Sequence, residues 1–467
     1  MLKTRGVGTA HQMTLVWWAL PILPALSMFA AGCHHPTGTS IDRQLIGEVM
    51  MHSELAANLR ALAMPGGRLS GSPNGRKAER FVADKLGEYG LGNVHFEPFE
   101  MTTWRDRETV VTVLDDPPRT LEGTLALGNS MSTPTEGVSA ELVDVGDGAK
   151  EGFRSHADEL PGAFAFVREG KLHRSKKMHM ALAYGAVGLV QVSKLDDRAR
   201  VGTCHSQPSP EPGVVITGAD GKALAERLGA GETVRINVRI EADAWSCEPN
   251  NVVAEIHGTG PSADEVVILC AHLDSWHLAE GALDNGVGSA AILEAARALA
   301  RGGWRPDRTV RFVWFMGEEH GLHGSEAYVR DHAGELDNVV AVVNVDMPGS
   351  PRKFATFGHP EIIGFLLSVR DELVGFELND EIANATWTAS DHAPFMKQGV
   401  CALALYGDLG PGVKYYHSTG DTYEQVDLRG TTEAAVVLAV LVRRLADCPE
   451  RPTVRFDPKE LAAEMGW

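Results

Sequence analysis

The second half of the chain alternates short apolar runs with longer stretches of helical periodicity, and this pattern limits the possible folds most. The runs EVVILCA, TVRFVWFM, NVVAVVNVD and VCALALY are continuously apolar, as in strands that are covered on both faces. Ala- and Leu-rich stretches such as SAAILEAARALA lie between them and favour helices. Because strands that alternate with helices form a parallel sheet between helix layers, we predict an α/β fold, a three-layer α/β/α domain with a central, mostly parallel sheet.

The region before this pattern has a different texture. Short Val-rich runs, such as GAFAFVREG, GAVGLVQVS and PGVVITGADG, alternate with Gly, Pro and Asp turns, and ADGKALAERLGAG reads as one short helix. A chain of 467 residues is long enough for two or three domains. We therefore predict a mostly β insert at residues 110–245, which divides the α/β domain into residues 34–109 and 246–467.

The N-terminus has the layout of an export signal. Lys3 and Arg5 precede an apolar run, which ends in the small residues AAG followed by Cys33. We interpret residues 1–33 as a signal peptide whose end resembles a bacterial lipoprotein cleavage site, with Cys33 as the lipidated first residue of the mature protein. A plain cleaved signal and an N-terminal membrane anchor are the alternatives. The expected location is the periplasm or cell envelope, with a lipid anchor at Cys33.

Charge and hydropathy exclude two classes of partner. The formal net charge of −19 repels phosphate backbones, so nucleic acid is not expected as a partner. The apolar stretch in TTEAAVVLAVLVRRLADC is short and ends at Arg443 and Arg444, which favours a buried helix over a membrane span. Contact with a membrane is therefore expected only through the N-terminal lipid or signal, and a homodimer is left open.

The cysteines suggest at most two disulfides. The chain has six, and if Cys33 carries lipid, at least one of the remaining five must be free. Cys204 and Cys247 could pair in an oxidising compartment. Cys270 and Cys401 lie in apolar runs and are expected to be small buried residues.

Polar residues with metal-binding side chains follow the predicted strands. Each alone is weak evidence, because a His-x-Asp triplet or a Glu-Glu pair is commonly a surface feature. In open α/β sheets, however, ligands collect at the carboxyl ends of the strands, and these residues come from several such ends. In chain order they are His272, Asp274, Glu318, Glu319, Asp346 and His417.

This set of residues suits a catalytic zinc site. Imidazole and carboxylate ligands without thiolates are typical of catalytic zinc, and two metals about 3.5–4 Å apart need a shared carboxylate. Asp284, in the glycine-rich stretch LDNGVGSA, could be that bridge. Asp274 could accept the second imidazole proton of His272, and Glu318 could take the proton from an activated water.

Six motifs strengthen this interpretation. HLDSW, GALDNGVGSA, GEEHGLHGS, NVDMPGS, SDHAPF and YYHSTGDTYEQVD resemble the M28 family of zinc peptidases, and the chain is most similar to its carboxypeptidase Q (plasma glutamate carboxypeptidase) branch. The resemblance covers almost everything after the signal. It implies that the β insert corresponds to a protease-associated (PA) domain.

The resemblance also implies two zinc ions per chain and a role for each ligand. His272 and Asp346 would hold one ion, Glu319 and His417 the other, and Asp284 would bridge them.

Two further roles follow from the same resemblance. Glu318 would be the general base and later the acid, and Tyr416 matches a tyrosine that steadies the oxyanion in some relatives. Asn285 follows the bridging residue where some relatives have a second Asp, and the peptide bond at this point is often cis in the family.

The expected activity is that of a zinc-dependent exopeptidase acting on short peptides. Whether it is an aminopeptidase, a dipeptidase or a carboxypeptidase is left open, because no acid for a free amine is identified and no Arg near the motifs stands out for a terminal carboxylate. A single-zinc glutaminyl cyclase and a non-catalytic binding protein on a peptidase scaffold are the alternatives. The number of bound zinc ions distinguishes the three: two for the exopeptidase, one for the cyclase and none for the binding protein.

We predict that the mature protein begins at a lipidated Cys33. The charged, apolar and AAGC order of the N-terminus motivates this expectation. Mass spectrometry of the N-terminal peptide from the membrane fraction tests it. An unmodified terminus, or a terminus at another residue, contradicts it.

Overall fold

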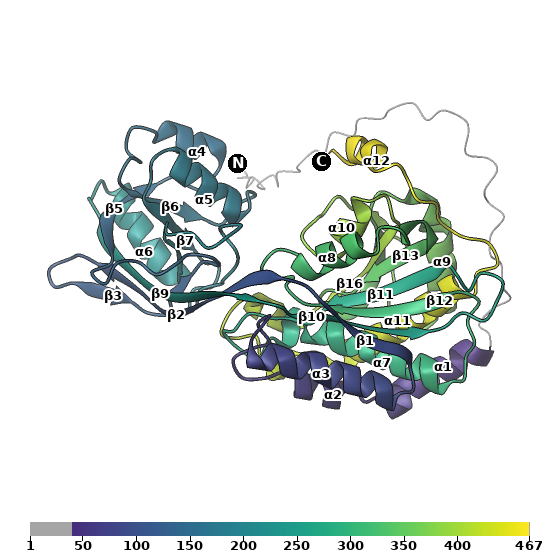
Figure 1. Cartoon of the computed structure of the whole chain (residues 1–467). Helices are drawn as coiled ribbons and strands as arrows, with labels where there is room; N and C mark the ends of the chain where they lie inside the picture. The colour runs from purple at the N-terminus through teal and green to yellow at the C-terminus, as the bar shows by residue number, and fades with distance from the viewer. Residues whose placement is uncertain (1–39, 467) are drawn as a thin grey trace, which may run out of the picture. The chain divides into compact units, whose positions relative to one another are not determined.

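The computed structural model describes residues 40–466, so the predicted signal peptide and Cys33 lie outside the described residues. Within this range a central sheet has eight strands in the order β1-β10-β12-β11-β13-β16-β14-β15 (Figure 1). The inner strands β12, β11, β13 and β16 pair in parallel, and antiparallel pairs flank them on both sides. The predicted α/β fold with a mostly parallel central sheet is confirmed. The strands are β1 (Gly92–Pro98), β10 (Asn250–Ile256), β11 (Val266–His272), β12 (Thr309–Phe315), β13 (Val339–Asn344), β14 (Ser350–Thr356), β15 (Ala383–Asn384) and β16 (Ala402–Asp408).

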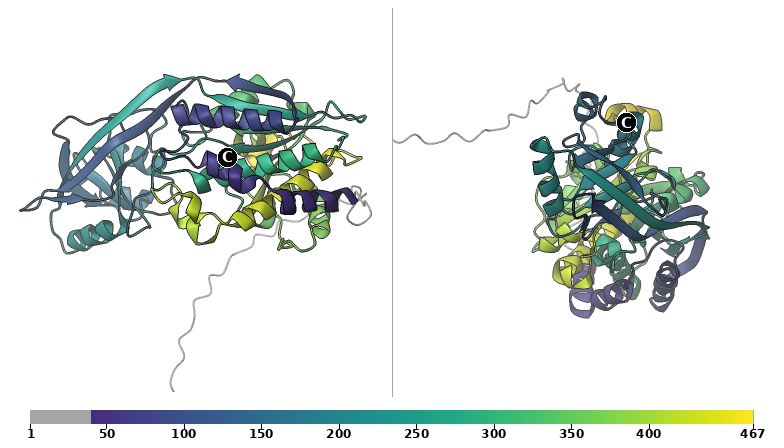
Figure 2. Two further views of the ribbon diagram at one scale, coloured as in Figure 1. Left: turned by 90° about the horizontal axis from the view of Figure 1, so that it is seen from below. Right: turned by 90° about the vertical axis from the view of Figure 1, so that its left-hand side faces the viewer.

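Helices cover both faces of this sheet, which gives the predicted three layers (Figure 1, Figure 2). The larger apolar core lies on the face covered by α1, α2, α3, α7, α9 and α11, and a smaller core lies under α8 and α10. The helices of this domain are α1 (Ser40–His52), α2 (Leu55–Leu62), α3 (Pro73–Glu88), α7 (Val287–Arg301), α8 (His323–Asp331), α9 (Ile363–Glu372), α10 (His392–Met396), α11 (Leu428–Ala446) and α12 (Pro458–Met465).

Helix α3 illustrates how local signals set the boundaries. The Ser72 side chain caps it by accepting from Gly75 N, and Pro73 stands at the first helical position, where its missing N–H costs nothing. Gly90, with φ of 80°, follows the end of the helix. The apolar face of the helix is buried at Val82 and Leu86 and packs into the larger core.

The apolar C-terminal helix is buried rather than membrane-spanning. The segment TTEAAVVLAVLVRRLADC forms most of α11, whose residues from Ala434 to Ala446 are buried. Among residues 40–466, no helix has both the length and the hydropathy needed to cross a bilayer. The expectation of a buried helix is confirmed.

The part of the chain between β1 and β10 forms a second sheet. Its order is β3-β2-β9-β5-β6-β7-β8-β4, with an antiparallel ribbon of two long strands, β2 and β9, and three parallel pairs. The ribbon nearly continues the pair β1 and β10, because Pro98 faces Asn250 in one ladder and Met101 faces Cys247 in the other. Figure 2 shows these long strands side by side. The strands are β2 (Met101–Val113), β3 (Arg119–Leu121), β4 (Leu125–Ala126), β5 (Val138–Asp144), β6 (Phe164–Arg168), β7 (Gly188–Val192), β8 (Gly213–Ile216) and β9 (Arg235–Cys247).

This insert contains more helix than the sequence indicates. Three helices accompany the second sheet, α4 (Lys150–Ser155), α5 (Arg174–Ala183) and α6 (Gly218–Gly229), whereas only the last was predicted. Helix α4 is too short to show a period, and α5 begins with a basic run that has no apolar repeat. The domain division at residues 110 and 245 stays a prediction, since β2 and β9 run across both positions.

The suggested pairing of Cys204 with Cys247 is wrong. Both are free, and they pack in different places, with Cys204 Sγ 3.5 Å from Ser130 Oγ and Cys247 Sγ 4.0 Å from Ser70 O. Cys270 and Cys401 are buried, as expected from the apolar runs that contain them.

A buried ion-pair network joins the N-terminal helices to α7. The side chains of Arg297 and Glu294 are fully buried and pair at 2.7 Å, and Arg297 also pairs with Glu48 of α1 at 2.6 Å. Glu294 accepts a further bond from the main-chain N of Glu54 at 3.0 Å. Because removal of one partner leaves the other charge buried and uncompensated, this network couples helix docking to stability.

We predict that Arg297→Ala lowers the free energy of unfolding by about 3–5 kcal/mol, since Glu294 loses its counter-charge inside the core. Urea unfolding followed by circular dichroism measures the change. Arg301→Ala is the matched control, because that side chain is 54% exposed and pairs with Glu54 at 3.4 Å; its effect should stay below about 0.5 kcal/mol. Equal losses in both variants would contradict the assignment.

Candidate metal centre

Five side chains meet at the carboxyl edge of the inner strands. They form two groups whose ligand atoms lie within 4.8 Å of one another, and the two groups share Asp284. His272 is the last residue of β11, and the others follow strand ends or lie in the loops beyond them. The groups are His272, Asp284 and Asp346, and Asp284, Glu319 and His417. These are the five residues that the sequence analysis singles out as ligands.

Asp284 lies between the two imidazoles. Its Oδ1 is 3.2 Å from His272 Nε2, and its Oδ2 is 3.0 Å from His417 Nε2. Asp346 Oδ1 lies 3.6 Å from His272 Nε2, and Glu319 Oε2 lies 3.1 Å from His417 Nε2. Each oxygen of Asp284 therefore faces a different half of the site, as a bridging carboxylate requires.

The turn Ala282–Gly286, which carries Asp284, is fixed by buried hydrogen bonds. The carboxylate of Asp421 accepts the main-chain N–H groups of Leu283 and Asp284, at 2.6 and 3.1 Å. The Asp284–Asn285 peptide bond is cis. Asp421, in the loop that follows His417, thus holds this turn in place.

Asn285 ties the same turn to the loop of Asp346. Its Nδ2 donates to Val345 O at 2.8 Å, and its Oδ1 accepts from Gly288 N and Met347 N at 2.9 and 3.1 Å. An aspartate could accept these bonds but could not donate to Val345 O. The bond to Val345 O therefore favours an amide at position 285.

Arg68 is a buried residue of this site that the sequence analysis misses. Its guanidinium donates to the carbonyl oxygens of Leu62, Leu273, Glu280 and Gly281 at 2.8–2.9 Å. Burial lowers its pKa, while the nearby carboxylates, Asp421 first among them, act in the opposite direction. Only the fold brings these carbonyl groups around one side chain, so no sequence signal could have found it.

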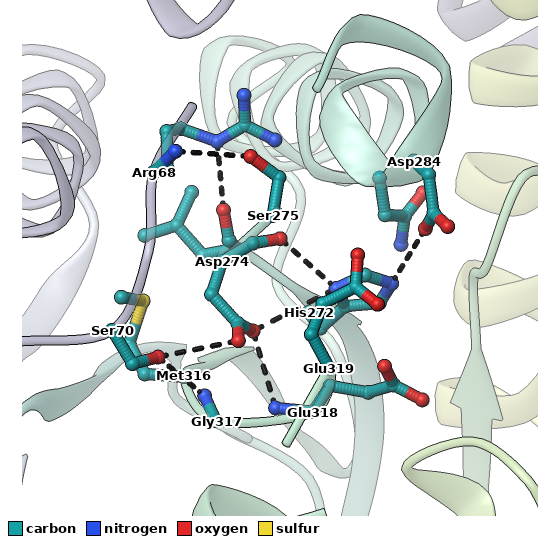
Figure 3. Close-up of polar contacts among 12 residues, drawn as sticks. Arg68, Ser70, His272, Asp274, Ser275, Asp284, Met316, Gly317, Glu318 and Glu319 are labelled. Carbon is teal, nitrogen blue, oxygen red and sulfur yellow. Dashed lines mark hydrogen bonds and ion pairs between the residues drawn. The ribbon is translucent and has the colours of Figure 1, made fainter. Parts of the chain in front are cut away.

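Asp274 and Ser70 hold the loop of the two glutamates. The Asp274 carboxylate accepts from Ser70 Oγ and from Glu318 N, both at 3.2 Å, and Ser70 Oγ accepts from Gly317 N at 2.8 Å (Figure 3). Toward His272 the closer acceptor is the Asp274 carbonyl, 3.1 Å from Nδ1, whereas the carboxylate is 3.7 Å away. The carboxylate of Asp274 was expected to accept the second imidazole proton of His272. The main-chain carbonyl of Asp274 lies nearer to that nitrogen.

Residues of the insert contact the imidazole of His417. Val201 O lies 3.2 Å from His417 Nδ1, which leaves Nε2 facing Asp284 and Glu319. Val201 N also donates to His417 O at 2.8 Å, and Thr203 Oγ1 donates to Glu319 O at 2.8 Å. Residues 201–203 of the insert thus hold two of the five clustered residues.

The donor set fits a divalent cation. Glu319 Oε1 is buried and has no hydrogen-bond partner among the described residues. Burial, reinforced by Asp284, raises the pKa of Glu319 to about 7 when no cation is present. Burial also raises the pKa of Glu318 well above its usual value, and Glu319 and Asp346 add to this effect. A cation among nitrogen and oxygen ligands would relieve this accumulation of charge.

A small pocket opens beside the cluster. Trp276 forms part of its wall and packs against the His320 and His417 rings, with centroids 5.0 and 6.2 Å apart. A larger hollow of about 440 Å³ lies under α1, away from the clustered ligands, so the smaller cavity is the one that the chemistry favours. Its lining residues are Trp276, Leu278, Ala279, Gly281, Asp284, Glu319, His417, Ser418 and Asp421.

Tyr416 lies next to the cluster in a half-buried position. Its ring centroid is 4.6 Å from that of His417, and the guanidinium of Arg200 stacks over it at 4.5 Å. This packing fixes the ring beside the ligands.

Three comparisons agree on the family. The profile of peptidase family M28 matches residues 251–442. Carboxypeptidase Q of Xenopus laevis is 28% identical over 400 residues, which cover 82% of this chain and 84% of that protein. The protein named "Probable lipoprotein aminopeptidase LpqL" of Mycobacterium tuberculosis is 31% identical over 333 residues, 70% of this chain and 62% of its own length. The crystal structure of a peptidase M28 precursor from Shewanella amazonensis covers 90% of this chain and 98% of its own, with a TM-score of 0.79 and 25% identity.

We predict that His272→Ala and Asp284→Ala both lower the zinc content of the purified protein, with the larger loss for Asp284, because its two oxygens face both halves of the site. Elemental analysis measures bound zinc. His257→Ala is the matched control, since that side chain is 63% exposed and lies outside the cluster. Full zinc occupancy in both site variants would show that the metal binds elsewhere.

Proposed function

The chain belongs to peptidase family M28, a family of zinc exopeptidases, and we propose that it is a two-zinc exopeptidase that hydrolyses short peptides. The observation that carries the proposal is the pair of ligand groups that share Asp284. His272 and Asp346 would hold one ion, Glu319 and His417 the other. Bound there, the two ions would polarise a water molecule and the scissile carbonyl group.

Glu318 is the proposed proton carrier. Its main-chain N–H is held by Asp274, so its side chain starts from a fixed point beside the ligand Glu319. The carboxylate would take a proton from the attacking water and give it to the leaving amine as the C–N bond breaks. Asp274 would act as a positioning residue. Its carboxylate accepts from the main-chain N–H of Glu318, and its carbonyl oxygen contacts His272 Nδ1.

Tyr416 is proposed to steady the negative charge that develops on the carbonyl oxygen. Its ring packs against that of His417 and lies under the guanidinium of Arg200, which supports this role. A hydroxyl donor aimed at a developing oxyanion contributes only in the transition state.

The substrates are proposed to be short peptides, and the pocket beside the ligands supports binding of a peptide at this point. The names of the relatives, carboxypeptidase Q and an aminopeptidase, support cleavage at a chain end. In the proposed domain division, residues 34–109 and 246–467 form the peptidase domain, and residues 110–245 form a PA-like insert.

The lipoprotein name of the Mycobacterium tuberculosis relative supports export and an anchor at Cys33. The two complete ligand groups, with Glu318 beside them, argue against the single-zinc cyclase and the binding protein.

We predict that Glu318→Gln lowers kcat by about 10²–10⁴-fold with little change in KM, because the amide keeps the shape of the side chain but cannot accept a proton. Zinc content and melting temperature should stay near wild type, since no ligand is removed. Glu319→Gln is the control that should lose metal as well as rate. Glu318→Gln retaining more than about a tenth of the turnover at full zinc occupancy would exclude it as the base.

A further inference from the structure

His320, which directly follows the proposed ligand Glu319, is a buried histidine that the proposed mechanism does not use. Its side chain is 3% exposed, and its Nε2 lies 3.1 Å from the main-chain carbonyl oxygen of Trp104 in β2. Because a carbonyl oxygen can only accept, Nε2 carries the hydrogen in this contact and donates it. The loop of the two glutamates is therefore bonded to a long strand of the insert through His320.

The carboxylate of Glu319 has few contacts of its own. Its Oε2 lies 3.1 Å from His417 Nε2, and its Oε1 is buried without a hydrogen-bond partner among the described residues. Within that part of the chain, no donor other than the ligand imidazole sets the direction of this side chain. Its place depends on the main chain of the loop, and hence on the contacts that hold residues 318–320.

The bond of His320 is one of three that hold successive residues of this loop from outside it. The main-chain N–H of Glu318 donates to the Asp274 carboxylate at 3.2 Å, and the main-chain oxygen of Glu319 accepts from Thr203 of the insert at 2.8 Å. In these two bonds the loop contributes only main-chain atoms, whereas His320 contributes its side chain. A substitution at His320 therefore removes one of the three bonds and leaves the other two, and every ligand, in place.

Trp104 gives this contact a fixed partner. Its side chain is fully buried in the core of the insert, and its Nε1 donates to Ser130 O at 2.9 Å. Further along β2, Asp106 Oδ1 lies 2.8 Å from Nε2 of His277, which belongs to the loop after β11. The ladder with β9 has a bulge between Asp106 and Glu108, and bulges redirect the side chains of a strand. Residues 104–106 are thus fastened to the insert and to the peptidase domain at once.

We propose that His320 is a positioning residue of the metal centre, which holds Glu319 in the direction needed to bind the second zinc ion, the one that Glu319 shares with His417. This inference rests on the proposed two-zinc function and adds to it a residue outside the ligand set. Removing a polar partner behind a metal ligand commonly weakens metal binding by about 10- to 100-fold. The competing explanation is packing alone, because the His320 ring also lies 5.0 Å from that of Trp276.

The test separates the bond from the packing by two substitutions of the same residue. His320→Phe keeps a ring against Trp276 but cannot donate, whereas His320→Gln loses the ring but can place an amide N–H near the position of Nε2. Zinc is titrated into the metal-free proteins in competition with a chromophoric chelator. His320→Phe should weaken one of the two zinc Kd values by about 10- to 100-fold and leave the other within about twofold of wild type. His320→Gln should keep both Kd values within about threefold of wild type.

Two ligand variants identify the ion that is affected. In Glu319→Gln, added His320→Phe should leave the Kd of the remaining ion unchanged, because the ligand through which His320 acts is already lost. In Asp346→Asn, added His320→Phe should still weaken the ion that Glu319 and His417 hold. His323→Phe is the matched control, since that histidine begins α8 and its ring forms no hydrogen bond with the described residues. Both of its zinc Kd values should stay within about twofold of wild type.

The outcomes separate the two proposals. Equal weakening of both ions in His320→Phe, or two unchanged Kd values, would overturn the positioning role while leaving the two-zinc function intact. An equal loss in His320→Gln and His320→Phe would assign the effect to packing against Trp276 and overturn the role as well. If the melting curve shows that His320→Phe does not fold, His320→Asn takes its place, because its amide is too short to reach Trp104 O. A wild type that binds one zinc ion or none would overturn the proposed function, and this inference with it.

Discussion

The guanidinium of Arg68 is the interaction on which the geometry of the centre depends. It gathers the end of α2, the strand end that carries His272, and the turn that carries Asp284 by donating to their carbonyl groups. Several carboxylates lie in a small, poorly solvated volume nearby, and a neutral side chain could join the same carbonyls without opposing that charge. A cation here does both, so the protein itself holds together the loops that carry the ligands.

The sequence predicts the central sheet well because its physical cause is local. Runs such as EVVILCA must be covered on both faces, and the polar residues at their ends have one edge to occupy, which brings His272 and Glu319 together. The features that escape prediction have long-range causes. Arg68 lies far from the motifs in the sequence, and the separation of Cys204 and Cys247 depends on where the folded chain places the loop of Cys204 and the end of β9. The helix α5 escapes because its first turn is basic and its apolar residues have no clear period.

Two parts of the chain build the centre together. The strand ends of the α/β domain supply the clustered ligands, while residues 201–203 of the insert fix the second imidazole and the main chain of Glu319. The shared contacts mean that the insert is part of the architecture of the site. Trp276 also joins the two parts, since it packs against Trp104 of β2, at 6.4 Å, and against the His417 ring.

The register of the long ribbon has an evolutionary consequence. Because Pro98 and Asn250 face each other in the ladder of β1 and β10, the chain leaves the α/β domain and returns to it at adjacent points. An ancestor without the insert would need only a tight hairpin there. Such a protein would keep every clustered ligand but would lack the contacts of Val201 with His417. The ligands and the contacts that hold two of them therefore come from different stretches of the gene, so a change in residues 201–203 would alter the setting of His417 and Glu319 without altering any ligand.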